Sequence, residues 1–142
     1  MPPSSATTVK KLARKVRVLI ADDHDVIRGM VRSTLQQHPE FEVCGEAADG
    51  AQAIEEAKKL KPDVVVLNVS MPILNGFEAA REIRATLPKS AIVILSSHAD
   101  ERFVREAKEI GVRAYVAKSR AGEALVKAVE AAVLGEDFVL VK

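Results

Sequence analysis

Residues 64–72 of the chain read VVVLNVSMP. Four apolar residues are followed by Asn68, and Pro72 stands four positions after this asparagine. A short and wholly apolar run, rich in β-branched residues, is typical of a strand in a parallel sheet that is buried on both faces. Four other runs are also short and rich in β-branched or small apolar residues. The sequence therefore predicts five strands, at residues 17–21, 41–47, 64–68, 91–96 and 114–117.

Segments with helical periodicity follow each of these strands. The five predicted helices begin near Asp25, after Asp49-Gly50, after Asn75-Gly76, near Asp100 and near Arg120. Prolines follow the first three helices, and Gly111 and Gly135 are placed to end the last two in a left-handed conformation. This alternation predicts an α/β fold: a five-stranded parallel sheet in the order 2-1-3-4-5, doubly wound with five helices and flavodoxin-like.

Polar residues stand where the predicted strands end. Asp22 and Asp23 follow the first strand, Asn68 ends the third, Ser96 ends the fourth and Lys118 follows the fifth. Each is ordinary alone, because an Asp-Asp pair is commonly a helix cap and an isolated lysine is commonly solvated. In a doubly wound sheet, however, the carboxyl ends of the strands share one rim, and ligands bind there. Their convergence predicts a functional site.

Length and composition fit one ordinary domain. The chain has 142 residues, of which 48% are hydrophobic, and a formal net charge of +1. A nearly neutral chain does not favour direct nucleic-acid binding through a broad basic surface. The single cysteine, Cys44, is interpreted as a buried structural thiol in a protein of the reducing cytoplasm.

The two ends of the chain are predicted to lie outside the domain. Residues 1–15 carry Pro, Ser and Thr followed by Lys10, Lys11, Arg14 and Lys15, without the apolar core of a signal peptide or membrane span. We expect a mobile N-terminal arm at 1–15, a domain at 16–135, and a C-terminal tail or the start of a linker at 136–142. No membrane association is expected.

Four motifs give the chain a specific resemblance. They are VLIADDH at 18–24, VLNVSMP at 66–72 leading to Asn75-Gly76, LSSH at 95–98 and YVAK at 115–118. In this order they resemble the receiver domain of two-component response regulators, over essentially residues 16–134. The sequences of these motifs are most similar to those in the branch whose receivers precede a helix-turn-helix DNA-binding domain. The resemblance implies a non-enzymatic signalling module.

The resemblance implies a role for each residue at the rim. Asp23 would coordinate Mg²⁺ directly, Asp22 through water, and Ser70 through its backbone carbonyl. Lys118 and Ser96 would contact a phosphoryl group. Tyr115 would be the switch aromatic that turns into the space that Ser96 vacates.

Loop residues beside the rim are also carried over, with one departure. Pro72 and Gly76 would shape the loop after position 68, with Gly76 permitting a positive φ at the turn. Ser119 stands where the family often has a cis proline, which leaves the geometry of the Lys118-Ser119 bond open. His24 and His98 are interpreted as loop residues rather than zinc ligands, because no second soft ligand has a convincing spacing.

Asn68 occupies the position at which the family carries its phosphoacceptor aspartate. An amide has no nucleophilic oxyanion at neutral pH, so Asn68 cannot form an acyl phosphate, and its oxygen would ligate Mg²⁺ only weakly. We therefore expect weak Mg²⁺ binding and a resting state in which Ser96 and Tyr115 are not drawn inward. Whether Asn68 is natural or introduced stays open.

Three functions remain as alternatives at this stage. The first is a receiver that is locked against phosphotransfer, and the second is a natural phosphate-independent pseudo-receiver that acts through protein contacts. The third is a nucleotide- or flavin-binding enzyme on the same fold. The resemblance implies a sensor histidine kinase as partner and leaves open a C-terminal DNA-binding output domain. A homodimer through the predicted fourth and fifth helices is also left open.

Overall fold

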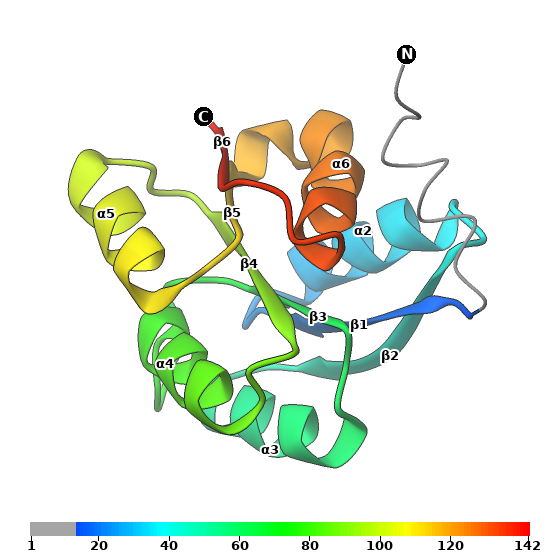
Figure 1. The fold of residues 1–142 in the computed structure, drawn as a ribbon, viewed down its shortest axis with the longest axis horizontal. Coiled ribbons are helices and arrows are strands. Elements are labelled where there is room, and N and C mark those ends of the chain that lie inside the picture. Colours follow the sequence, from blue (N-terminus) through cyan, green and yellow to red (C-terminus); the bar gives the residue numbers. More distant parts are fainter. Residues whose placement is uncertain (1–13) are drawn as a thin grey trace.

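The computed structural model describes residues 14–142, in which strands and helices alternate along the chain (Figure 1). Apart from Arg14 and Lys15, the predicted N-terminal arm lies outside the described residues. The strands are β1 (Val16–Ala21), β2 (Phe41–Ala47), β3 (Val64–Leu67), β4 (Ala91–Ser96), β5 (Ala114–Ala117) and β6 (Val139–Val141). The helices are α2 (Asp25–Gln36), α3 (Gly50–Leu60), α4 (Gly76–Thr86), α5 (Glu101–Ile110), the 3-10 turn η1 (Lys118–Arg120) and α6 (Ala121–Val133).

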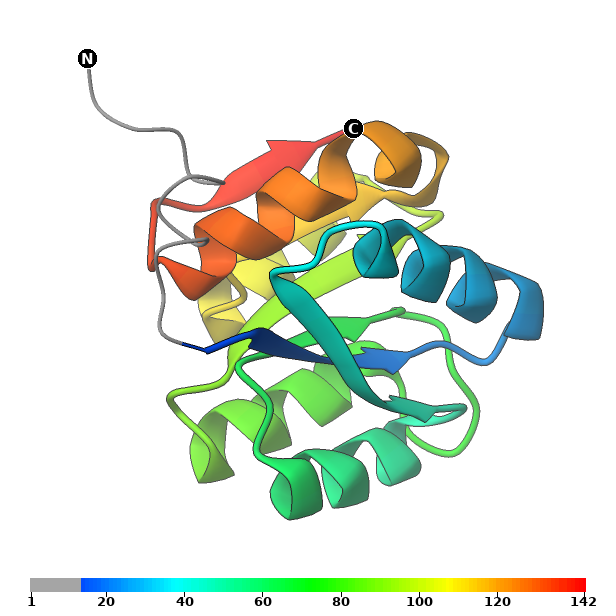
Figure 2. The same ribbon diagram turned by 90° about the vertical axis from the view of Figure 1, so that its right-hand side faces the viewer.

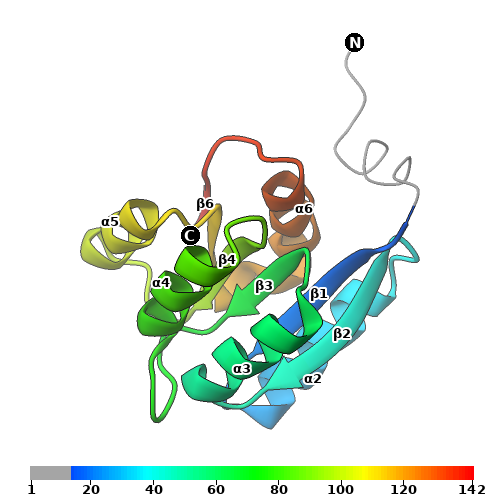
Figure 3. The same cartoon turned by 60° about the horizontal axis from the view of Figure 1, so that its bottom comes forward.

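The sheet has the order β2-β1-β3-β4-β5-β6, and each neighbouring pair is parallel. The predicted order of the first five strands is confirmed. The sixth strand was not predicted: Gly135 has φ +71°, and the chain then returns so that Val139 pairs with Ala114 at the edge of β5. Figure 3 shows β2 and β6 at the two ends of the sheet. Part of the tail at 136–142 thus belongs to the sheet.

Helices cover both faces of the sheet, as Figure 2 shows. Buried residues of α3, α4 and α5 form one hydrophobic cluster with the strands, including Ala53, Ile83 and Ala107. Buried residues of α2 and α6 form a second cluster, including Leu35 and Leu125. Because both faces are covered, β3 and most of β4 are completely apolar, as the sequence indicated.

The helices begin and end close to the residues that the sequence predicted, for identifiable reasons. Asn75 and Glu78 form a reciprocal capping box at the start of α4, and Asp100 accepts two backbone N–H bonds at the start of α5. Gly111 has φ +98° and ends α5 in the left-handed region. Cys44 is a free thiol that is only partly buried against the core, so the prediction of a buried thiol was too strong.

Candidate functional site

The registry of the sheet brings the predicted polar residues to one rim. Ala21 pairs with Leu67, so Asp22 and Asn68 leave neighbouring strands at the same height. On the other side, Ser96 pairs with Ala117, and Lys118 follows directly. Asp22, Asn68 and Ser96 are all buried, with 4% or less of each residue exposed. Parallel pairing is therefore the physical cause of the cluster.

The side-chain amide of Asn68 lies at the centre of three oxygen atoms. Its Nδ2 donates to the Ser70 carbonyl at 2.8 Å and to Asp23 Oδ1 at 3.2 Å, and it lies 3.5 Å from Asp22 Oδ1. The resemblance to receiver domains implied a role in cation binding for these three residues. The amide hydrogens thus partly compensate the negative charge of the carboxylates.

Lys118 compensates the most buried carboxylate. Its Nζ lies 3.0 Å from Asp22 Oδ2, and only 4% of the Asp22 side chain and 12% of the Lys118 side chain are exposed. The backbone N–H of His24 donates to the other oxygen of Asp22 at 2.9 Å. A buried carboxylate is tolerated only when it is paired and hydrogen-bonded in this way.

Two further residues contact the rim: His24, which was predicted only as a loop residue, and Arg28, which was not predicted there. His24 Nδ1 lies 3.2 Å from Asp22 Oδ1 and 3.2 Å from Asp23 Oδ1. Arg28 donates to the Asp22 carbonyl at 2.7 Å and to Glu46 at 3.0 Å, which ties the start of α2 to β2. The position of His24 directly after the Asp pair was a usable signal for the first contact. No signal in the sequence indicated the contacts of Arg28.

Tyr115 is completely buried, which corrects the expectation that it would rest outward. Its hydroxyl donates to the His98 carbonyl, while the Ser96 hydroxyl accepts from the His98 N–H at 3.0 Å. Burial raises the pKa of the Tyr115 hydroxyl, and a hydrogen bond with Ser96 opposes that rise. The β4–α5 loop therefore holds the aromatic ring inside the protein.

The loop after Asn68 is tight for a different reason than predicted. Gly76 does not have a positive φ; a Cβ there would lie 2.1 Å from the Asn68 carbonyl oxygen, so glycine is required for close backbone approach. The positive φ falls instead on Ile73, at 70°, within a three-residue turn in which the Leu74 N–H donates to the Pro72 carbonyl at 2.7 Å. Pro72 thus lies in the loop as expected. Residues 14–142 contain no cis peptide bond, so the Lys118-Ser119 bond is trans.

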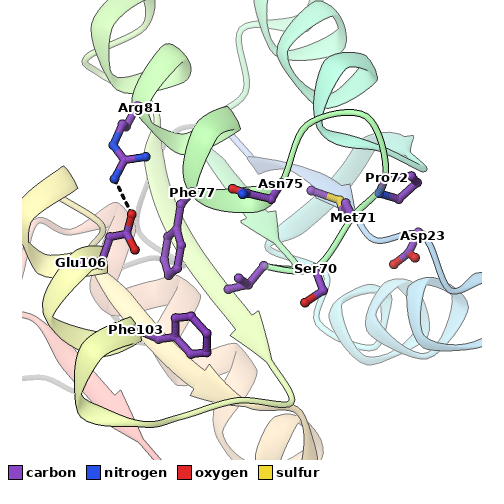
Figure 4. Close-up of a pocket in the computed structure, with 10 residues that line it drawn as sticks. Asp23, Ser70, Met71, Pro72, Asn75, Phe77, Arg81, Phe103 and Glu106 are labelled. Carbon is purple, nitrogen blue, oxygen red and sulfur yellow. Dashed lines mark hydrogen bonds and ion pairs between the residues drawn. The ribbon is translucent and has the colours of Figure 1, made fainter.

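A cavity of about 640 Å³ opens beside the rim, between α4 and α5 (Figure 4). Asp23 and Ser70 line one end, and the rings of Phe77 and Phe103 line the other. Arg81 and Glu106 form an ion pair across the two helices at its far side. The cavity thus adjoins the rim at Asp23 and Ser70.

The donor set at the rim fits a hard divalent cation. Asp22, Asp23 and His24 each offer a ligand atom within 4.8 Å of the others, and the Ser70 carbonyl accepts from the same Asn68 amide nitrogen as Asp23 Oδ1. Carboxylate and carbonyl oxygens are the ligands that Mg²⁺ prefers. None of the helices in residues 14–142 has the length and apolar character that a membrane span requires.

Comparison with known proteins agrees with this geometry. Residues 18–130 match the response regulator receiver domain. The transcriptional regulatory protein DegU of Brevibacillus brevis is 34% identical over 125 residues, which cover 88% of this chain and 53% of DegU. The chain thus spans about half the length of this relative.

Solved structures show the same fold. The receiver domain of the putative response regulator NarL from Mycobacterium tuberculosis superimposes with a TM-score of 0.82 at 34% identity, covering 87% of this chain and 99% of that one. A LuxR-family two-component response regulator from Aurantimonas gives a TM-score of 0.83 at 33% identity, covering 87% and 88%. With its four family motifs on β1, β3, β4 and β5 and in the residues that follow these strands, this chain belongs to the receiver domain family of two-component response regulators.

Proposed function

We propose that this chain is a receiver module that cannot accept a phosphoryl group and that acts through protein contacts. The observation that carries the proposal is Asn68, which lies at the end of β3 among Asp22, Asp23, Ser70 and Lys118. A carboxylate in this position would be a nucleophile, whereas a carboxamide is not. The surroundings are those of an acceptor site, and the acceptor chemistry is missing.

For the remaining residues of the site we propose the roles that the matching positions have in the receiver family. Asp23, Asp22 and the Ser70 carbonyl would hold Mg²⁺, which when bound neutralises phosphoryl oxygens. Lys118 and Ser96 would contact the phosphoryl group in a chain with aspartate at position 68, and Tyr115 would report its presence. Pro72 and Gly76 would keep the loop closed over the site.

Mg²⁺ binding is proposed to be weak in this chain. The Asn68 amide nitrogen already donates to the oxygen atoms that would ligate the ion, so the amide has to turn over before its oxygen faces a cation. The substitution also removes one negative charge from the cluster. Both effects lower the affinity for Mg²⁺.

A phosphate-independent switch is the second candidate, and the burial of Tyr115 favours it. The ring lies inside the protein, and its hydroxyl donates to the His98 carbonyl. A receiver that has adopted this arrangement without phosphorylation would present one fixed α5-β5-α6 face to partners. The nucleotide- or flavin-binding alternative is set aside, because the matched family is a signalling module and the carboxylates would repel a phosphate.

A sensor histidine kinase, or a protein that resembles one at its docking surface, is the proposed partner at the rim. Val26 and Ile73, which are 83% and 81% exposed, together with the half-exposed Met30, provide apolar contacts on α2 and the β3–α4 loop. We further propose a receiver at 16–135 and a tail at 136–142 that either caps the sheet or begins a linker to a DNA-binding output domain. A homodimer through α5 and α6, and a cytoplasmic location that suits the free thiol of Cys44, complete the proposal.

Intact mass after exposure to acetyl phosphate and Mg²⁺ tests the proposal on this chain and on Asn68→Asp. We expect the aspartate variant alone to gain one phosphoryl mass. If neither protein gains it, the site has lost more than its acceptor, and the phosphate-independent function replaces the first. A phosphoryl mass on this chain at position 68 would refute both.

A further inference from the structure

Strand β6 lies along the edge of β5, between α5 and α6, as Figure 1 and Figure 3 both show. Its side chains alternate between the two helices. Val139 and Val141 pack against the hydrophobic cluster that α6 helps to form, whereas Leu140 lines a cavity of about 330 Å³ together with residues of α5. Phe138 packs against the other cluster, and Lys108 Nζ of α5 lies 5.1 Å from its ring centroid. The tail therefore contacts both helices that flank β5.

The pairing of β6 places Leu140 beside Tyr115. The two residues are partners in the register of the parallel strands. Paired residues of neighbouring strands project from the same face of a sheet, so both side chains point toward α5. Tyr115 is 0% exposed. If β6 left the sheet, β5 would become the edge strand, and one flank of Tyr115 would face solvent.

Strand β6 is much less buried than the strand that it covers. Ala114, Tyr115 and Val116 of β5 are all 0% exposed, whereas no residue of β6 is fully buried and Leu140 is 41% exposed. Residues 134–138 join α6 to β6, and they include Gly135, which has φ +71° and open space around the position of a Cβ. A segment with few buried apolar contacts opens locally at a low free energy. We therefore expect β6 to leave β5 while the rest of the sheet stays folded.

We propose that β6 is a releasable cover that holds Tyr115 inside the protein and closes the α5-β5-α6 face to partners. An uncovered β5 would offer a row of unpaired backbone groups beside two helices, which is a template for association with another chain. The inference rests on the proposed use of this face by partners. The coupling between β6 and Tyr115, however, is independent of the phosphoryl chemistry at position 68, so the two proposals can fail separately.

Fluorescence of the full chain tests the coupling, because the chain has one tyrosine and no tryptophan. Acrylamide should quench Tyr115 only weakly in the wild type. In Val139→Asn/Val141→Asn, polar groups replace the apolar contacts of β6, and the quenching constant should rise toward that of N-acetyltyrosinamide. The control Ala51→Asn/Ala85→Asn introduces the same side chains at exposed positions of α3 and α4 and should behave as the wild type.

Hydrogen exchange on the unsubstituted chain is a second test. The Val139 N–H donates to the Arg113 carbonyl at 3.2 Å. After correction for intrinsic rates, we expect it to exchange at least about tenfold faster than the amides of Val66 and Val93 in the core strands, with little dependence on low concentrations of denaturant. Exchange of Val139 at the rate of these amides, with the same denaturant dependence, would show that β6 opens only on global unfolding and would overturn the proposal.

The release variant separates this inference from the proposed homodimer. A folded Val139→Asn/Val141→Asn protein in which Tyr115 is as protected as in the wild type would overturn the cover. An accessible Tyr115 together with a dimer in light scattering would support both proposals. An accessible Tyr115 in a protein that stays monomeric would support the cover and contradict the homodimer.

Discussion

Asn68 donates its side-chain N–H to the Ser70 carbonyl at 2.8 Å, a contact that an ionised aspartate could not make. An aspartate oxygen in the same place would face the carbonyl and two carboxylates, and all of these would repel it. The Asn68 amide therefore stabilises the oxygen atoms of the rim by donating to them. Two thermodynamic consequences follow at this position, one for cation affinity and one for stability.

Asn68→Asp should bind Mg²⁺ at least tenfold more tightly than the wild type, because it adds a charge and removes the competing donor. Without Mg²⁺ the same variant should have a lower Tm, since three carboxylates then face one another. Calorimetric titration and thermal unfolding with and without Mg²⁺ measure both effects. Equal Mg²⁺ affinity in the two proteins would contradict the account.

Lys118→Met should destabilise the fold by about 3 kcal/mol, because it leaves Asp22 buried and charged without its cation. The matched double variant Asp22→Asn/Lys118→Met removes both charges and should recover a large part of that loss. Urea unfolding of the two single variants and the double variant measures the coupling. Additive losses would show that Lys118 and Asp22 do not compensate each other.

Gly76→Ala should be strongly destabilising, by several kcal/mol, because its Cβ would lie 2.1 Å from the Asn68 carbonyl oxygen. Gly122→Ala is the matched control in α6, where a Cβ meets nothing within 4 Å. For Gly122→Ala we expect the free energy of unfolding to rise by about 0.5–1 kcal/mol, because alanine has a higher helix propensity than glycine. Denaturant unfolding that gives similar changes at the two sites would contradict a close-approach role for Gly76.

Tyr115→Phe should cost about 1 kcal/mol at neutral pH, since the His98 carbonyl loses its buried donor. The folded-state pKa of Tyr115 is raised, so the wild type should also lose stability as pH rises above about 10, where the unfolded tyrosine ionises first. The phenylalanine variant lacks that contribution. Stability curves of the two proteins between pH 8 and roughly 11 should therefore converge as pH rises; parallel curves would contradict a buried hydroxyl.

The pattern of the sequence was sufficient for the framework of the fold and for the position of the site. Wholly apolar runs such as 64–67 fix buried parallel strands, and Asp22, Asn68 and Lys118 stand at their ends. Because parallel strands end at one rim, sequence position alone placed these side chains together. Local signals such as Asn75 and Gly111 also located helix ends, since caps depend on neighbouring backbone groups.

Contacts between distant segments were decided only by the tertiary structure. The inward position of Tyr115 depends on a carbonyl 17 residues away, and the need for Gly76 depends on the backbone of Asn68. The pairing of β6 with β5 likewise arises where remote segments pack. Periodicity and capping residues depend only on contacts within one helix or strand, so the sequence alone can predict them. Steric approach and burial of charge depend on which other element lies against it, and that is set only when the whole chain has folded.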